Sequence, residues 1–107
     1  MILHENTVMG LGDGGAHVGT ICDASFITSL LTHWGRDRVR GERIDLPTLV
    51  RSQTWDTARA VDLSDRGTLQ LGKRADINVI DFDNLNVSIK GHPTIHKRYM
   101  TAGAIRI

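Results

Sequence analysis

The sequence predicts an α/β fold in which a helix-rich part is followed by a strand-rich part. Three observations support this. A strand pattern over residues 6–9 leads into a glycine-rich loop, an amphipathic helix pattern follows that loop, and β-branched residues are frequent in the second half. The composition changes near Leu63–Asp65. We therefore predict two units, residues 1–62 and residues 63–107.

The glycine-rich loop is the most unusual segment of the chain. Residues 10–17 read Gly-Leu-Gly-Asp-Gly-Gly-Ala-His, so one carboxylate, that of Asp13, stands among residues with almost no bulk. Glycines permit positive φ values and a close approach of the backbone to a ligand. The loop follows the C-terminal end of the predicted strand, where α/β proteins carry their chemistry. Asp13 is therefore a candidate metal ligand, proton carrier or both.

Two helix patterns follow the loop. The first is expected to begin after Asp23 as N-cap and to end at Gly35. Its apolar face repeats at helical spacing: Ile27, Leu30, Leu31 and Trp34. The second has Pro47 in its first turn and a short continuation capped by Thr54. Its expected buried face consists of Leu46, Leu49 and Val50, and the continuation is expected to run through Ala58 and Val61.

Strand patterns dominate after Leu63. Residues 68–71 and 85–89 alternate, and residues 76–82 are rich in β-branched side chains. A single strand–helix unit has no sheet on which to dock, and a few isolated strands leave exposed edges. Both halves are therefore expected to be parts of larger structures.

The composition limits the kinds of partner. Thirteen basic and twelve acidic side chains nearly cancel in these 107 residues, so we expect no nucleic-acid or membrane partner. The short basic cluster is read as a solvated surface, with phosphate binding as the alternative: Arg36, Arg38, Arg40 and Arg43. The lone Cys22, the lack of an apolar run of ~20 residues and the lack of a signal-peptide pattern predict a cytoplasmic protein.

Other interpretations of the loop remain open. The spacing of Gly10, Gly12 and Gly15 matches a dinucleotide fingerprint, but Asp13 would place negative charge where a pyrophosphate should bind. The P-loop pattern fails, because Thr20-Ile21 stands where Lys-Ser/Thr is required. Asp13 could also simply form an Asx-turn.

The remaining candidate side chains have ordinary explanations as well. His17, His4 and His33 are typical hydrogen-bonding or packed histidines, and Cys22 is a small buried hydrophobe unless a base activates it. His92 and His96 have i, i+4 spacing, but no Glu stands between them, so the zinc motif His-Glu-x-x-His is absent.

Several short sequence motifs together resemble the C-terminal part of the amidohydrolase superfamily, and its D-aminoacylase (N-acyl-D-amino-acid deacylase) type in particular. The first three are the loop over 10–17, Cys-Asp-Ala-Ser over 22–25 and Leu-Thr-His-Trp-Gly-Arg over 31–36. Further matches are Thr54-x3-Ala58 and Asp65-Arg66-Gly67-x-Leu69-x2-Gly72-x2-Ala75-Asp76. The resemblance covers about residues 4 to 85.

This resemblance implies a metal-dependent hydrolase built on a (β/α)₈ TIM barrel. Residues 1–62 would supply its last βα unit and terminal helices, and residues 63–107 part of a small β-sandwich domain. Asp13 matches the family's aspartate beside a Zn²⁺ ion, which accepts the proton of the attacking water and passes it to the leaving amine. His17 is a second candidate, for substrate contact. Gly12 stands where the family often has Ser.

The family's other metal ligands have no counterpart in this sequence, which contains no His-x-His. A catalytic zinc takes about three protein ligands. We therefore expect this chain to be inactive alone and to require another chain or a longer polypeptide to act on an N-acyl amino acid. Two alternatives stay open: a non-catalytic module that binds a partner through the Ile27–Trp34 helix face, and a nucleotide-binding βα unit.

Overall fold

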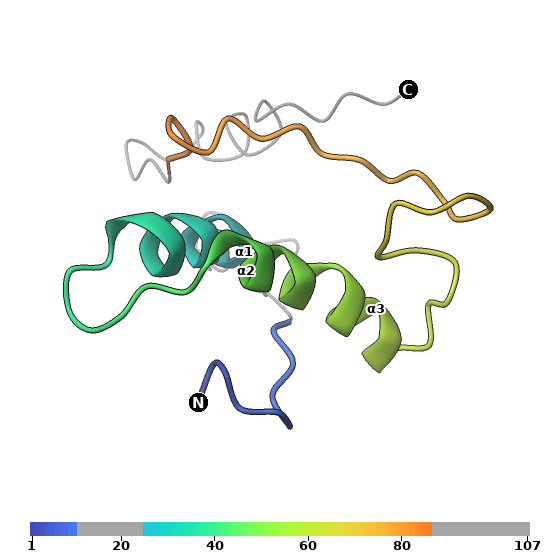
Figure 1. Cartoon of the computed structure of the whole chain (residues 1–107), viewed down its shortest axis with the longest axis horizontal. Helices are drawn as coiled ribbons and strands as arrows, with labels where there is room; N and C mark the ends of the chain where they lie inside the picture. Colours follow the sequence, from blue (N-terminus) through green and yellow to red (C-terminus); the bar gives the residue numbers. More distant parts are fainter. Residues whose placement is uncertain (11–24, 87–107) are drawn as a thin grey trace, which may run out of the picture.

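The computed structural model describes residues 1–10 and 25–86. The described part is helical, and α2 and α3 follow one another while the chain after them loops out and returns along the helices (Figure 1). The elements are α1 (Phe26–Ser29), η2 (Leu30–Asp37), α2 (Leu46–Gln53) and α3 (Trp55–Ala60). Among these described segments, no helix has the length and apolar character needed to cross a membrane.

The helix formed by α1 and η2 changes its winding partway along. Residues 26–29 are α-helical, whereas residues 30–37 wind more widely, as a π-helix. Two hydroxyl groups donate within the turn that joins them: Ser29 Oγ to the Phe26 carbonyl at 3.0 Å and Thr32 Oγ1 to the Thr28 carbonyl at 3.2 Å. Such side-chain hydrogen bonds to carbonyls compete with the regular backbone hydrogen bonds of an α-helix. This competition favours a looser turn. The expected N-cap, Asp23, lies outside the described residues, and Ser25 stands at the N-cap position.

Gly35 does not end this helix, so that prediction was wrong. The helix runs on to Asp37 and stops where Arg38 becomes extended, with the Arg38 N–H donating to the His33 carbonyl at 2.8 Å. Gly35 instead permits close packing. A Cβ there would lie 2.9 Å from Leu49 Cδ1 and 3.5 Å from Phe82 Cζ. The glycine thus serves the contact between η2 and α2 rather than a turn.

The second helix begins as predicted. Asp45 is its N-cap, and its carboxylate accepts a hydrogen bond from the Thr48 N–H at 3.0 Å, while Pro47 occupies the first turn. The continuation after Thr54 also forms, as α3. Thr54 does not cap it with its side chain, however. Its hydroxyl donates backward to the Val50 carbonyl at 2.8 Å, which ties α3 to the end of α2.

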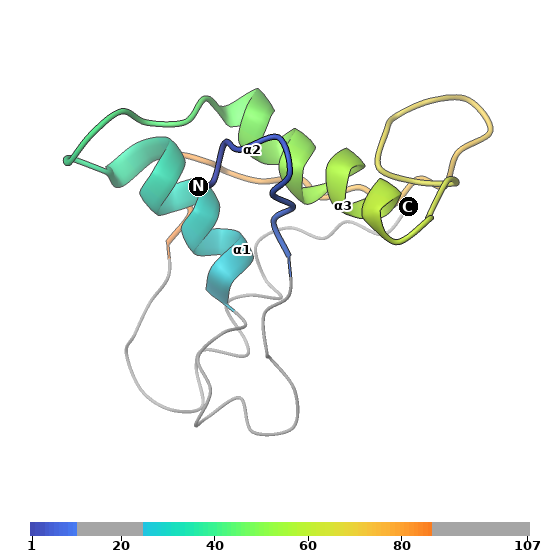
Figure 2. The same ribbon diagram turned by 90° about the horizontal axis from the view of Figure 1, so that it is seen from below.

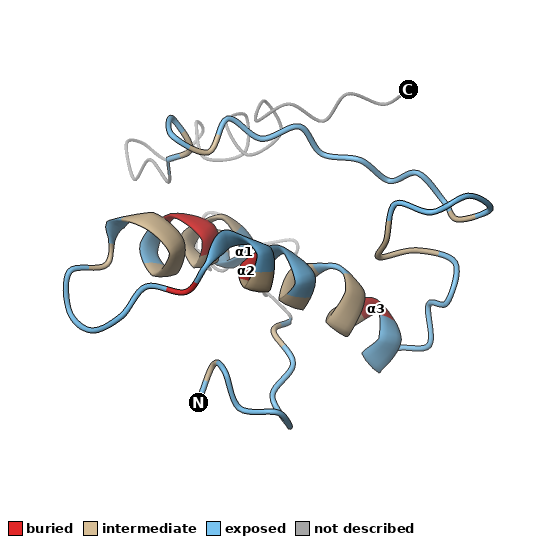
Figure 3. Ribbon diagram, viewed as in Figure 1, coloured by how far each residue is buried: buried red, intermediate tan, exposed pale blue. Residues whose placement is uncertain are grey.

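The core of the described residues is small and centres on Leu49, which is 1% exposed (Figure 3). Leu31 and Ile44 complete the buried cluster. Partly buried side chains pack around it from both ends of the described chain: Ile2, Leu30, Trp34, Phe82 and Leu85. The helical faces were therefore predicted only in part. Ile27 is 64% exposed, and Leu46 and Val50 also face outward.

The structure has no strand within residues 1–10 and 25–86. The patterns at 6–9, 68–71 and 76–82 therefore did not produce strands here. A strand is stabilised by hydrogen bonds to a neighbouring strand, and no such ladder joins these segments. The turns between them do form, with Gly67 at φ +90° and Gly72 at φ +82°. The β-sandwich stays a prediction.

Replacement of Leu49 by alanine should be the most damaging truncation in the described core. It removes methyl groups at the point where α2 meets η2, and such cavities cost about 2–5 kcal/mol. Val50→Ala is the matched control, since Val50 is 43% exposed and should change the free energy of unfolding by about 0.5 kcal/mol or less. Urea denaturation followed by circular dichroism measures both. Equal effects of the two variants would contradict this core.

The Asp45 cap should make part of the stability depend on pH. Hydrogen bonds from Thr48 hold the pKa of the Asp45 carboxyl below its ordinary value. Its stabilisation is therefore complete above about pH 4 and is lost as the pH falls through the lower pKa of the folded state. The Asp45→Ala variant should have a lower free energy of unfolding than wild type at pH 7, and this free energy should fall less on acidification. The same is expected of Asp45→Asn, whose side chain cannot ionise. Urea unfolding at a series of pH values measures this. A wild-type advantage that stays constant down to pH 2 would contradict it.

Candidate functional site

The sequence-predicted site lies outside the described residues. Asp13, His17 and Cys22 belong to residues 11–24, and the two C-terminal histidines to residues 87–107, so their roles remain predictions. The structure shows what frames the loop. Gly10 comes before it, and Ser25 comes after it at the N-cap of α1. In Figure 2 the end of the N-terminal segment and the start of α1 lie on the same side of α2 and α3.

The described residues alone do not form a metal centre. Within residues 1–10 and 25–86, no three His, Cys, Asp or Glu side chains gather closely enough to hold an ion. His33 packs edge-on against Trp34, with ring centroids 5.5 Å apart. The Nδ1 of His4 accepts a hydrogen bond from the Asn6 N–H at 3.2 Å. Both histidines thus have the ordinary roles expected of them. The fit of the implied zinc depends on Asp13 and on further ligands that residues 1–10 and 25–86 do not provide.

Arg36 fastens the helical part to the segment that returns along the helices, residues 82–86, called the returning segment below. Its Nη1 donates to the Phe82 carbonyl at 2.6 Å and to the Asp83 carbonyl at 3.0 Å, and its Nη2 donates to the Leu85 carbonyl at 2.8 Å. The same guanidinium binds both oxygens of Asp37, at 2.7 and 3.0 Å. The basic cluster was predicted to be a solvated face, and for Arg36 that was wrong. Its fork of donors matches several oxygens at once.

The pair with Asp37 stabilises both charges. The hydrogen bond from Arg36 holds the pKa of the Asp37 carboxyl below its usual value, and the same contact raises the pKa of Arg36. The two groups are thus charged together at neutral pH, and the carboxylate steadies the guanidinium in the orientation that meets the carbonyls of residues 82–85.

Two other arginines of the cluster, Arg38 and Arg43, bind their own chain. The guanidinium of Arg38 lies 4.2 Å from the centroid of the Trp34 ring, and its Nε donates to the Arg40 carbonyl. Arg43 Nε donates to the Arg38 carbonyl at 3.2 Å. These contacts brace the connection between η2 and α2. They favour the structural interpretation of the cluster over a phosphate site.

The charged residues of the motif over residues 65–76 also have a structural role. Arg66 lies between Asp65, at 2.9 Å, and Asp76, at 3.5 Å. The Arg74 N–H donates to the Asp65 carbonyl at 2.8 Å, which closes the loop between the two glycine turns. The hydrogen bond from Arg66 lowers the pKa of the Asp65 carboxyl. This part of the resembling motif therefore holds a loop together rather than forming a reactive site.

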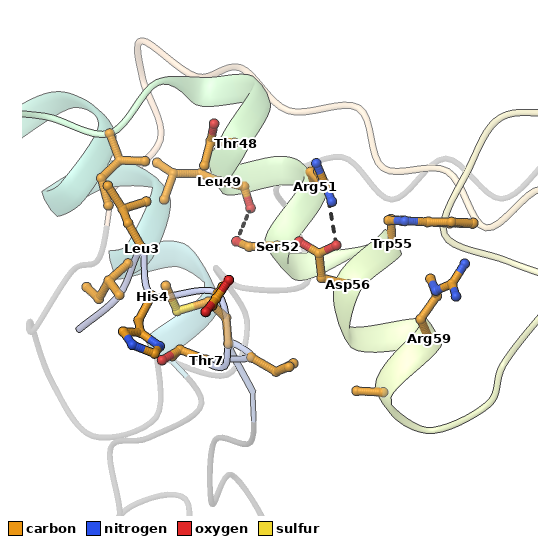
Figure 4. Close-up of a pocket in the computed structure, with 16 residues that line it drawn as sticks. Leu3, His4, Thr7, Thr48, Leu49, Arg51, Ser52, Trp55, Asp56 and Arg59 are labelled. Carbon is orange, nitrogen blue, oxygen red and sulfur yellow. Dashed lines mark hydrogen bonds and ion pairs between the residues drawn. The ribbon is translucent and has the colours of Figure 1, made fainter.

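A groove that sequence reasoning missed runs between the N-terminal segment and helices α2 and α3 (Figure 4). It has a volume of about 730 Å³, and Ile44 and Leu49 contribute to its apolar lining. On the helix side, Arg51 and Asp56 form an ion pair at 3.2 Å. No local pattern could have indicated this groove, because its walls are about forty residues apart in the sequence.

Comparison with known proteins identifies the class. A model of the Amidohydrolase family matches residues 1–97, which is most of the chain. The chain therefore belongs to the amidohydrolase family, a family of hydrolases that generally depend on a metal. No curated protein and no solved structure matches it. The resemblance in the sequence is thus confirmed at the level of the superfamily, and its D-aminoacylase type stays a prediction.

Arg36→Lys should release the returning segment. Lysine keeps the positive charge but cannot reach three carbonyls and a carboxylate together. We expect faster hydrogen–deuterium exchange and faster proteolysis around residues 82–86, with the helices unchanged. Arg40→Lys is the control, because Arg40 is exposed and its side chain forms no hydrogen bond or ion pair within the described part of the chain. Unchanged exchange in Arg36→Lys would show that the clamp does not hold the segment.

Proposed function

We propose that this chain carries the aspartate loop of an amidohydrolase that cleaves the C–N bond of a linear amide, an N-acyl-D-amino acid. The family match carries the proposal, because it spans residues 1–97 and so includes the loop with Asp13. The short sequence motifs that resemble the D-aminoacylase type support this substrate class. Amide hydrolysis also suits a carboxylate that can move a proton, since the amine leaves only when it is protonated.

Asp13 is the residue to which we assign the proton transfer. Its carboxylate accepts a proton from the attacking water and returns it to the nitrogen of the leaving amine. When bound, Zn²⁺ would supply the acidity that lets this water ionise near neutral pH. His17, four residues further on, is assigned to contact with the substrate.

The remaining metal ligands are assigned to polypeptide outside these 107 residues. The sequence offers no His-x-His, and the described residues gather no group of three ligands. One carboxylate is too little for a catalytic zinc. The chain alone therefore binds zinc weakly and does not turn over substrate, and another chain or segment completes the site in the cytoplasm.

A non-catalytic interaction module is the second candidate. The exposure of Phe26 and Ile27, at 51% and 64%, favours it, because Ile27 begins the apolar helix face that would bind the partner and Phe26 lies next to it. Such a module would give no hydrolysis with any complementing polypeptide.

The test pairs the chain with the polypeptide encoded directly upstream of Met1. We expect that polypeptide to carry His-x-His, and the pair to bind zinc and hydrolyse N-acetyl-D-amino acids. Asp13→Asn should lower kcat by about 10²-fold or more, which is the usual size of a lost acid–base group. Asp62→Asn, at an exposed position just after the C-terminal end of α3, is the control.

Two results would contradict the proposal. One is full turnover in the Asp13→Asn pair. The other is stoichiometric zinc and turnover in the 107-residue chain alone, which would overturn the assignment of ligands to other polypeptide.

A further inference from the structure

The winding of η2 determines which of its side chains share a face. In an α-helix, residues five apart lie about 140° apart around the axis, because there are about 3.6 residues per turn. In a π-helix, the backbone hydrogen bonds join residues five apart, so such residues stand almost one above the other. η2 has the second winding, and the Arg38 N–H accordingly donates to the His33 carbonyl at 2.8 Å.

This winding brings Leu31 and Arg36, which are five residues apart, to the same side of the helix. Leu31 is 5% exposed and belongs to the buried cluster against which Phe82 and Leu85 pack. The guanidinium of Arg36 lies 5.8 Å from the centroid of the Phe82 ring and binds the carbonyls of both residues. With α-helical winding, Arg36 would lie about 140° around the axis from Leu31. The returning segment could then not pack on Leu31 and reach Arg36 at once.

The carbonyl of Trp34 gives a second link between the winding and the core. In an α-helix this carbonyl would accept from the N–H of Arg38, four residues further on. In η2 the Arg38 N–H donates to His33 instead, and the Trp34 carbonyl accepts a hydrogen bond from the Ile44 N–H at 3.0 Å. Ile44 is 7% exposed and is part of the buried cluster. The π winding therefore also holds the connection that leads into α2.

We propose that η2 is a two-state element whose winding determines whether the returning segment is docked. In the π form, Arg36 holds residues 82–86 against the buried cluster. In the α form, Arg36 turns away and the segment is released. π-helical turns inside α-helices are rare and are frequently found at functional sites.

This element connects the two predicted units, because η2 lies within residues 1–62 and the returning segment lies within residues 63–107. A change in the first unit thereby alters the position of chain in the second. The proposal does not depend on the proposed function, since no residue of the catalytic loop takes part in it.

Two hydroxyl groups at the start of η2 favour the π form. Ser29 Oγ and Thr32 Oγ1 donate to carbonyls of the preceding turn and compete with its α-helical hydrogen bonds. The variant Ser29→Ala with Thr32→Val removes both hydroxyls with little change in volume, so α winding should extend into η2. Arg36→Lys differs from this variant, because it loosens the segment while the hydroxyls still hold the winding.

Chymotrypsin cleavage after Phe82 in the full chain measures the release, because native-state proteolysis follows the population of the open form. We expect cleavage of the double variant to be about tenfold faster than that of wild type, since two hydrogen bonds are lost. The nuclear Overhauser effect between the His33 Hα and the Arg38 N–H should weaken in parallel. Ser52→Ala with Thr57→Val is the matched control. It removes two equivalent hydroxyl bonds from α2 and α3 and should leave both readouts unchanged.

Deletion of the exposed His33 separates the winding from mere loss of stability. The deletion leaves Leu31 and Arg36 four residues apart, and residues at that spacing share a face of an α-helix. A chain that lacks His33 should therefore keep slow cleavage, and the deletion should restore slow cleavage to the double variant. Circular dichroism shows that each variant keeps its helices.

Three outcomes overturn the proposal. The double variant is cleaved no faster than wild type, the control is cleaved as fast as the double variant, or a folded chain without His33 is cleaved as fast as the double variant. The last comparison holds even where the double variant fails to fold, because Arg36→Lys then supplies the cleavage rate of the released segment.

Discussion

The close approach of α2 to η2 at Gly35 is the constraint on which the rest of the described structure depends. Because Gly35 has no side chain, Leu49 can lie where a Cβ would be only 2.9 Å from its Cδ1, and Phe82 can reach the same point. Leu49 thereby becomes the most buried side chain of the described core. Three segments that are distant in the sequence meet there: the first helix, the second helix and the returning chain.

The polar contacts follow from that packing. Once Phe82 rests beside Gly35, the carbonyls of the returning segment lie within reach of the next residue, Arg36, whose guanidinium binds three of them. Asp37 completes the arrangement by holding the charge of Arg36. Nonpolar contact therefore places the segment, and charged hydrogen bonds fasten it. The start of α1, from which the predicted catalytic loop departs, belongs to the same helical rod.

The sequence predicted local features well and distant ones poorly. The place of Pro47 in the first turn of α2 depends on neighbouring residues, so it could be predicted directly, although the Asp45 N-cap was not. The family could be inferred from short motifs around Asp13. The role of Gly35 could not, because a glycine near a helix end and a glycine under a neighbouring helix look alike in sequence. The same holds for Arg36, whose partners are about fifty positions away. The strand patterns indicate a preference for extended backbone, but a strand forms only where a neighbouring strand supplies the hydrogen bonds.

Nuclear Overhauser effects at Gly35 test the central packing most directly. The account predicts strong effects from the Gly35 Hα protons to the Leu49 δ-methyl group, together with effects from the Leu49 methyls to the Phe82 ring. Leu49 methyls that show contacts only within their own helix would contradict it, since η2, α2 and the returning segment would then not share a core.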